Sequence, residues 1–287
     1  MSALLGRIGL YGRMIKFSHS VFALPFAFSS AVLAAGSGIS WRQVAWILVA
    51  MVGARSAAMG FNRLADQDLD ARNPRTAGRE LPRGVLSRGE VWLFVIASAA
   101  TLVVAAAMLN PLCLALSPVA LLVIFGYSYT KRFTALSHVF LGLALALAPM
   151  GAWLALRGRV EAPPVVLGLA VLFWVAGFDT IYACQDEAFD RAEGLHSLPA
   201  RLGTRRALVL ARLFHVVAVA LLAGLYALVP MHPLYLVGVS AVAGLLVYEH
   251  SLVRADDLSR IDAAFFTVNG WISLGYFVVT LAARLMA

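Results

Sequence analysis

Two clusters of carboxylates, each at the end of a long apolar segment, are the residues of this chain best suited to chemistry. Asn62, Asp66 and Asp70 recur four residues apart in the first cluster, and Asp186 and Asp190 do so in the second. On a helix this spacing places side chains one turn apart on one face. Carboxylate and amide oxygens suit Mg²⁺, which keeps waters and is shared with substrate phosphates. The clusters therefore predict a magnesium site for a charged head group.

Two further aspartates accompany these clusters. Asp68 lies off the helical stripe, which indicates a solvated or supporting group. Asp179 lies two turns before Asp186 within an apolar segment, where ionisable groups are costly and usually functional. Asp179 is read either as the partner of a buried arginine or as a group near the reacting centre. A polar helix end at a membrane surface would explain one aspartate of the first cluster, but poorly three within five residues.

The basic residues near the first cluster complement its charge. Several carboxylates that face one another repel unless cations neutralise them, and two Mg²⁺ ions would do so and attract a diphosphate. Arg63, Arg75 and Arg79 are close to the aspartates in sequence, and guanidinium groups match phosphate oxygens in bidentate geometry. Each arginine alone is also explained as a residue of a cytoplasmic loop. Together they predict a diphosphate clamp.

A third element is Tyr127 with Lys131, one turn apart if the helix continues. An interfacial tyrosine and a snorkelling lysine explain this pair equally well when it is taken alone.

The composition indicates an all-α, polytopic membrane protein. The 287 residues are 61% hydrophobic and 13% charged, and the mean hydropathy is +0.84. A spanning helix needs about 20 mostly apolar residues. The sequence predicts nine such spans, at 20–38, 42–62, 90–109, 111–128, 134–156, 164–185, 207–229, 233–250 and 262–283.

The aspartate clusters close the second and the sixth predicted spans, which indicates a coarse internal repeat. We expect one integral-membrane domain over residues 1–287, a bundle of two four-helix halves (about 1–130 and 131–250) and a ninth helix (262–283). Repeats that form a site at their interface are common in membrane proteins.

The cationic residues predict the orientation. With nine spans, one side of the membrane holds most arginines and lysines, and the other holds only Arg42, Arg157, Arg159 and Arg284. The positive-inside rule makes the crowded side cytoplasmic. Every Asp and Glu except Glu161 falls on that side or at helix ends there, so we expect the active site to face the cytoplasm from the cell membrane. The net charge of +8 is mainly this topology signal, and nucleic acid is not an expected partner.

The motifs in this order resemble the UbiA superfamily of intramembrane prenyltransferases. The resemblance covers essentially the whole chain and is carried by Asn62-Arg63-x-x-Asp66-x-x-x-Asp70, Tyr127-x-x-x-Lys131 and Asp179-x-x-Tyr182-x-x-x-Asp186-x-x-x-Asp190. The segments 16–25 and 194–199 are most similar to the 4-hydroxybenzoate polyprenyltransferase-like branch. His196 stands where many members of that branch have lysine, which leaves the aromatic substrate open.

The resemblance implies a site with two Mg²⁺ ions that holds an allylic polyprenyl diphosphate in contact with membrane lipid. The implied metal ligands, direct or through water, are Asn62, Asp66, Asp70, Asp186 and Asp190. The implied diphosphate contacts are Arg63, Arg79, Tyr127 and Lys131. The candidates near the aromatic acceptor are Lys16, Arg55, Arg132 and Asp179. Catalysis is assigned to the four motif aspartates and Asp179.

The implied reaction is transfer of the prenyl group to a ring carbon of a small aromatic acid in quinone biosynthesis. The acceptor is 4-hydroxybenzoate on a ubiquinone route or 1,4-dihydroxy-6-naphthoate on a menaquinone route. Other acceptors of the superfamily remain alternatives: 1,4-dihydroxy-2-naphthoate, heme, glycerol phosphate and chlorophyllide. A secondary transporter is a rival from another class, but transporters place coupling carboxylates near the midplane rather than at helix ends beside arginines.

Overall fold

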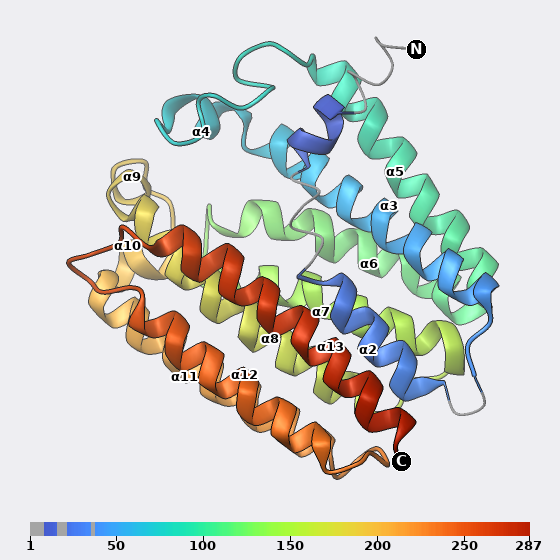
Figure 1. The fold of residues 1–287 in the computed structure, drawn as a ribbon. Coiled ribbons are helices and arrows are strands. Elements are labelled where there is room, and N and C mark those ends of the chain that lie inside the picture. Colours follow the sequence, from blue (N-terminus) through green and yellow to red (C-terminus); the bar gives the residue numbers. More distant parts are fainter. Residues whose placement is uncertain (1–8, 16–21, 36–37) are drawn as a thin grey trace. The chain divides into compact units, whose positions relative to one another are not determined.

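The computed structural model describes residues 9–15, 22–35 and 38–287, and their regular elements are helices (Figure 1). Within these residues eight helices are long and apolar enough to cross a membrane. They are α3 (Trp41–Ala65), α5 (Arg88–Leu109), α6 (Pro111–Thr130), α7 (Ser137–Arg157), α8 (Ala162–Ala183), α11 (Thr204–Leu225), α12 (Leu234–Ser251) and the π-helical turn η3 (Ala263–Val268) continued by α13 (Asn269–Leu285). The expectation of an all-helical polytopic membrane protein is confirmed.

The first predicted span corresponds to α2 (Leu24–Ala34), an apolar helix of 11 residues. At 1.5 Å per residue such a helix is about 16 Å long, well short of the ~30 Å hydrocarbon core. Residues 20–21 and 36–37 of the predicted span lie outside the described residues. Whether this first segment crosses the membrane, which would bring the number of spans to nine, therefore stays a prediction.

The chain forms two compact units, and the first comprises residues 1–20 and 44–129. Helix α3 approaches α5 closely, because a Cβ on Gly53 would lie 2.9 Å from the backbone nitrogen of Leu102. Phe61 packs on Phe125 of α6, with 4.6 Å between the ring centroids. Asn110 alone joins α5 to α6: its backbone is extended, and its Oδ1 accepts the Cys113 N–H at 2.9 Å.

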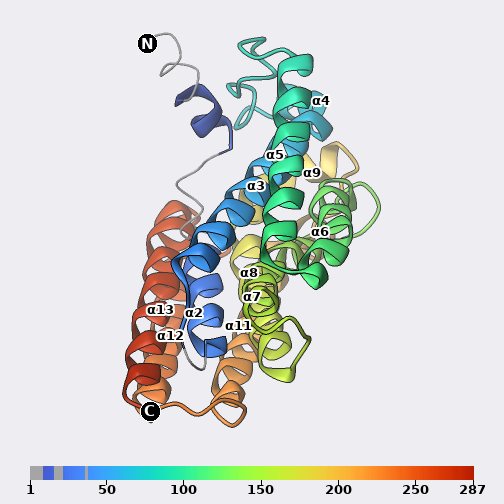
Figure 2. The same cartoon turned by 90° about the vertical axis from the view of Figure 1, so that its right-hand side faces the viewer.

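The second unit comprises residues 21–43 and 130–287, and its long helices form a closed ring. In order around the ring, α2 packs on α7, α7 on α8, α8 on α11, α11 on α12, α12 on α13, and α13 again on α2. Figure 2 shows α2 beside α13 in this ring. Helices α7 and α8 come so close at Gly142 that a Cβ there would overlap the carbonyl of Leu172.

Polar side chains inside this ring are hydrogen-bonded to one another. Trp174 Nε1 donates to Asn269 Oδ1 at 2.8 Å, and Asn269 Nδ2 donates to Glu249 Oε1 at 3.2 Å. Asn269 Nδ2 also donates to the carbonyls of Ala264 and Phe265 in the π-helical turn. Such a turn leaves carbonyls without their usual partners, so Asn269 stabilises it.

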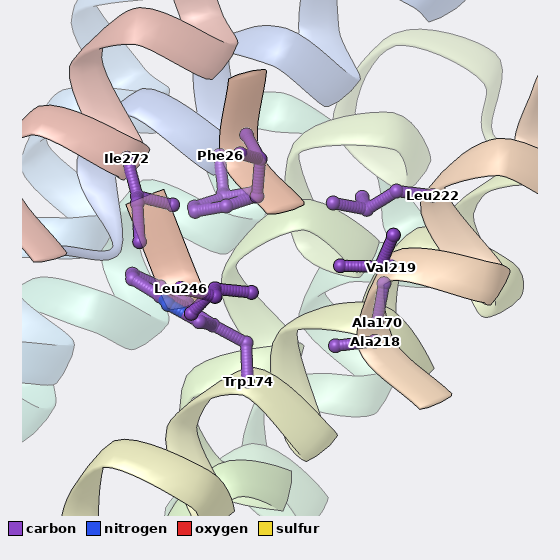
Figure 3. A pocket seen from close by; sticks show the side chains of 9 residues that line it. Phe26, Ala170, Trp174, Ala218, Val219, Leu222, Leu246 and Ile272 are labelled. Atoms are coloured by element: carbon purple, nitrogen blue, oxygen red, sulfur yellow. The ribbon is translucent and has the colours of Figure 1, made fainter. Parts of the chain in front are cut away.

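A small apolar cavity lies inside the ring, between α2, α8, α11, α12 and α13 (Figure 3). No charged side chain lines it, so it offers nothing that would bind a diphosphate or an acid. Its lining residues are Phe26, Ala170, Trp174, Ala218, Val219, Leu222, Val242, Leu246 and Ile272.

Candidate active site

The first aspartate motif lies where α3 gives way to the six-residue helix α4 (Gln67–Arg72). Asp66 joins the two helices with φ −100° and ψ 4°. The i→i−4 hydrogen bonds nevertheless continue across the joint, from Asp66 N to the Asn62 carbonyl at 2.9 Å and from Asp70 N to the Asp66 carbonyl at 2.7 Å. The one-turn spacing predicted for Asn62, Asp66 and Asp70 is therefore kept although the long helix ends at Ala65.

The two aspartates of this motif are buried, and Asn62 is partly buried. Asp66 is 3% exposed and Asp70 is 5% exposed. Asn62 Nδ2 donates to Asp66 Oδ2 at 3.1 Å and to Ser128 Oγ at 3.4 Å, so both bonds use the amide nitrogen rather than the amide oxygen. An amide oxygen beside two carboxylates is a hard donor set that fits Mg²⁺ rather than a soft metal ion.

The segment after α4 folds back onto the motif. Arg79 Nη1 donates to both carboxylate oxygens of Asp70, at 2.6 and 2.8 Å. Thr76 Oγ1 donates to the Asp70 carbonyl at 3.1 Å, and the Arg75 N–H donates to Asn73 Oδ1 at 2.9 Å. The structure thus brings one residue of the predicted diphosphate clamp, Arg79, into direct contact with a predicted metal ligand.

Other predicted residues of this unit gather around Tyr127. Arg55, Asp66 and Arg63 are all within electrostatic range of its phenol group. The Arg63 side chain is buried and donates from Nε to the Met14 carbonyl at 3.1 Å, which ties α3 to the short helix over residues 9–14. Lys16 lies outside the described residues.

Lys131 does not continue the helix that carries Tyr127. Helix α6 ends at Thr130, so the one-turn spacing of the pair, which required the helix to continue, does not apply. The Lys131 carbonyl instead accepts the His196 N–H at 2.7 Å, which joins the α6–α7 connection to the loop 194–199. Arg132 follows in the same connection, and its place near the acceptor stays a prediction.

The second aspartate motif repeats the local geometry of the first. Helix α8 ends at Ala183 and is followed by the 3₁₀ turn η2 (Cys184–Asp186) and the six-residue helix α9 (Glu187–Ala192). Asp186 precedes α9 with φ −100° and ψ 4°, and Asp190 lies four residues further on. Lys131, Asp186 and His138 are within electrostatic range of Asp190, so the structure brings these predicted residues of the second unit together.

Sequence reasoning missed His138, which contacts the predicted catalytic residue Asp179. His138 Nδ1 lies 2.7 Å from Asp179 Oδ2. The only sequence signal was a histidine at the start of an apolar segment, because the contact joins α7 to α8 across 41 residues.

The two aspartate motifs belong to different units, and within the described ranges no three His, Cys, Asp or Glu side chains are grouped as a metal site. The shared two-metal site therefore stays a prediction.

The fold and these motifs define an integral membrane protein of spanning helices with an aspartate pair in each unit. The UbiA prenyltransferase family model matches residues 23–272, and the chain belongs to this family and is a prenyltransferase. It is 31% identical to a 4-hydroxybenzoate octaprenyltransferase of Azoarcus sp. over 94% of this chain and 95% of that one. It is also 31% identical to a 4-hydroxybenzoate octaprenyltransferase of Cupriavidus necator, over 98% and 99% of the two chains.

Solved structures agree with the family assignment. The apo structure of a UbiA homologue from Aeropyrum pernix K1 has a TM-score of 0.82 and 34% identity, covering 93% of this chain and 97% of that one. A UbiA homologue from Archaeoglobus fulgidus bound to DMAPP and Mg²⁺ has a TM-score of 0.74 at 22% identity, covering 96% and 99%, and shows likeness of fold. The resemblance read from the motifs is confirmed.

Proposed function

We propose that this chain transfers a polyprenyl group from an allylic polyprenyl diphosphate to a ring carbon of 4-hydroxybenzoate, with Mg²⁺, in ubiquinone biosynthesis. The observation that carries the acceptor is the 31% identity, over nearly the whole length of both chains, to relatives named 4-hydroxybenzoate octaprenyltransferase. The donor and the metal are supported by the aspartate motifs and by a solved UbiA homologue that holds DMAPP and Mg²⁺.

The metal would be held by Asn62, Asp66, Asp70, Asp186 and Asp190. The burial of Asp66 supports this role, because buried carboxylates need cationic partners, whereas Asp70 already has one in Arg79. When bound, two Mg²⁺ ions supply positive charge that stabilises the departing diphosphate. Their number is part of the proposal.

The diphosphate would contact Arg63, Arg79, Tyr127 and Lys131. Arg79 supports this role best, since its guanidinium already lies beside a motif aspartate. A guanidinium that pairs with Asp70 through one terminal nitrogen keeps other N–H groups for phosphate oxygens. These residues would favour cleavage of the allylic C–O bond, with the electron pair leaving on the diphosphate.

The acceptor would lie near Asp179, Arg132, Arg55 and Lys16. Cationic groups there would pair with the carboxylate of the acid, and the ring carbon would form the new carbon–carbon bond. The ring proton would pass to Asp179 or to the released diphosphate. Asp179 is partly buried and keeps 24% of its side chain exposed, which leaves it accessible to a substrate.

Prenylation in detergent tests this function. Purified protein, Mg²⁺, radiolabelled prenyl diphosphate and 4-hydroxybenzoate should give a product whose mass is that of the prenylated acid. Parallel reactions with 1,4-dihydroxy-6-naphthoate address the second acceptor, because the histidine at position 196 leaves the aromatic substrate open. If product formed only with the naphthoate, the enzyme would belong to a menaquinone route. If neither acid were prenylated, the proposal would be contradicted.

We further propose nine spans in two four-helix halves plus a ninth helix, with the aspartate motifs facing the cytoplasm. The positive-inside distribution of arginine and lysine supports this orientation. Single cysteines at exposed positions of the 73–88 and 158–161 segments, labelled with an impermeant maleimide in right-side-out and inverted vesicles, would test it.

A further inference from the structure

His138 occupies one defined tautomer. The backbone N–H of Leu198 donates to His138 Nε2 at 3.3 Å, so this ring nitrogen must present its lone pair. The proton of the neutral imidazole is then on Nδ1, which lies 2.7 Å from Asp179 Oδ2 and donates to it. The His138 side chain is 5% exposed, so the imidazole ring is largely shielded from bulk water.

The residue that selects this tautomer belongs to the loop of the second aspartate motif. Leu198 begins α10 (Leu198–Leu202), and Ser197 caps this helix by accepting the Ala200 N–H at 3.3 Å. The loop is attached to the motif itself, because the Leu195 N–H donates to the Asp190 carbonyl at 2.8 Å. A chain of contacts therefore runs from Asp190 through the loop 194–199 and His138 to Asp179.

We propose that His138 is a positioning residue that holds the Asp179 carboxylate in its working orientation for the aromatic acceptor. The inference rests on the proposed function. A carboxylate on an apolar helix has few hydrogen-bond donors, so one fixed N–H decides which of its rotamers is populated. Asp179 keeps 24% of its side chain exposed, so the bond from His138 orients it without covering it.

The hydrogen bond between Leu198 and His138 also links the Asp179 carboxylate to the loop 194–199. Displacement of the loop 194–199 would remove the Leu198 N–H from Nε2 and free the ring to change tautomer. The Nδ1 donor to Asp179 would then be lost. The orientation of the Asp179 carboxylate toward the acceptor therefore depends on the position of the loop 194–199, which follows Asp190.

Two substitutions separate the two hydrogen bonds of the imidazole. The amide nitrogen of asparagine reaches the place of Nδ1, so His138→Asn keeps a donor for Asp179 and loses the acceptor for Leu198. The amide of glutamine reaches the place of Nε2, so His138→Gln keeps an acceptor for Leu198 and loses the donor. If His138 only anchored the loop, His138→Asn would impair the enzyme and His138→Gln would be tolerated. The proposal predicts the opposite: His138→Gln impairs prenyl transfer and His138→Asn is tolerated.

We expect His138→Gln to lower kcat/KM for 4-hydroxybenzoate roughly 10- to 100-fold, the range for a hydrogen bond to a charged group, with an unchanged KM for prenyl diphosphate. His138→Asn should retain most of the wild-type kcat/KM. In the Asp179→Asn background, His138→Gln should add little, because the carboxylate on which it acts is gone. The matched control is His232→Gln: His232 Nδ1 also accepts a backbone N–H, that of Leu234 at 3.2 Å, and in the described part of the chain it has no carboxylate partner.

A spectroscopic measurement tests the tautomer without turnover. Two-dimensional ¹⁵N–¹H spectra of ¹⁵N-histidine protein, with the His138 signals assigned from His138→Asn, should show the ring proton on Nδ1. A ring proton on Nε2, or equal tolerance of Gln and Asn in an active enzyme, would overturn this inference and leave the proposed function standing. A wild-type protein that prenylates no aromatic acid would overturn both.

Discussion

Asp66 and Asp186 share the same backbone conformation, φ −100° and ψ 4°, at the same kind of joint. Each joins a long apolar helix to a helix of six residues, directly or through a 3₁₀ turn, and each is followed four residues later by a second aspartate, Asp70 or Asp190. Sparsely populated torsions of this kind are frequent at functional positions. The shared geometry supports the internal repeat at the level of single residues.

Replacement of either joint aspartate should abolish prenyl transfer without unfolding the protein. Asp66→Ala and Asp186→Ala each remove a proposed metal ligand, so we expect product to fall below detection at saturating substrates. The matched control is Asp68→Ala, since Asp68 is exposed and lies outside the helical stripe. Near-wild-type turnover in either joint variant, with the melting temperature retained, would refute the metal assignment.

Removal of divalent cations should stop the reaction reversibly. Excess EDTA should abolish turnover, and Mg²⁺ added beyond the chelator should restore it, because the donor oxygens proposed here are hard ligands. Binding of radiolabelled prenyl diphosphate should show the same dependence. Binding and turnover that persist in EDTA would contradict a magnesium site.

Arg79→Lys should weaken use of the prenyl diphosphate. A lysine ammonium keeps the charge but loses the planar fork that allows Arg79 to contact Asp70 and a phosphate together. We expect KM for prenyl diphosphate to rise about tenfold, the effect of one lost charge-assisted hydrogen bond. Arg83→Lys, at an exposed position of the same segment, is the control and should behave as wild type.

Lys131→Ala should affect the diphosphate more than the acceptor. The expected result is a lower kcat/KM for prenyl diphosphate with little change in KM for 4-hydroxybenzoate. Arg201→Ala, an exposed cation of the same unit, serves as the comparison. If kcat and the diphosphate KM of Lys131→Ala both equalled those of wild type, Lys131 would have no role in the clamp.

Gly142→Ala should destabilise the protein by about 1–3 kcal/mol, the usual cost of overpacking. A Cβ at Gly142 would overlap the Leu172 carbonyl, whereas one at Gly151 on the same helix would meet nothing within 4 Å. Unfolding in detergent with increasing denaturant should therefore separate Gly142→Ala from Gly151→Ala. Equal midpoints for the two variants would contradict the close packing of α7 on α8.

The sequence predicts the long helices well because an apolar segment of about 20 residues in a membrane protein rarely forms anything but a spanning helix. The predicted segments 90–109 and 111–128 agree closely with α5 and α6, including the boundary at Asn110. The joint at Asp66 was not foreseen, because hydrogen bonding continues through it and the four-residue period is unbroken. Helix α6 ends at Thr130, two residues beyond the predicted segment, so the condition for a one-turn spacing of Tyr127 and Lys131 is not met.

Contacts between distant elements were beyond sequence reasoning. Nothing in the pattern of residues pairs His138 with Asp179, because the contact depends on how α7 packs against α8. Arg79 was placed near the aspartates only as a neighbour in sequence, and its bond to Asp70 depends on how the loop after α4 returns. Spacing along one helix can be read from sequence, whereas tertiary partners cannot.

The single-residue link at Asn110 constrains how the topology of this protein can be mapped. A reporter inserted between α5 and α6 would have to displace Asn110 from the Cys113 N–H and separate two helix ends that meet without a loop. The connection over residues 158–161 is different, because the Arg159 side chain is 68% exposed and Val160 is 63% exposed. Glu161 in that connection accepts from Trp153 Nε1 and from Arg159, and these hydrogen bonds lower its pKa. An epitope or label on that surface therefore belongs at Val160, whereas the Asn110 link tolerates neither.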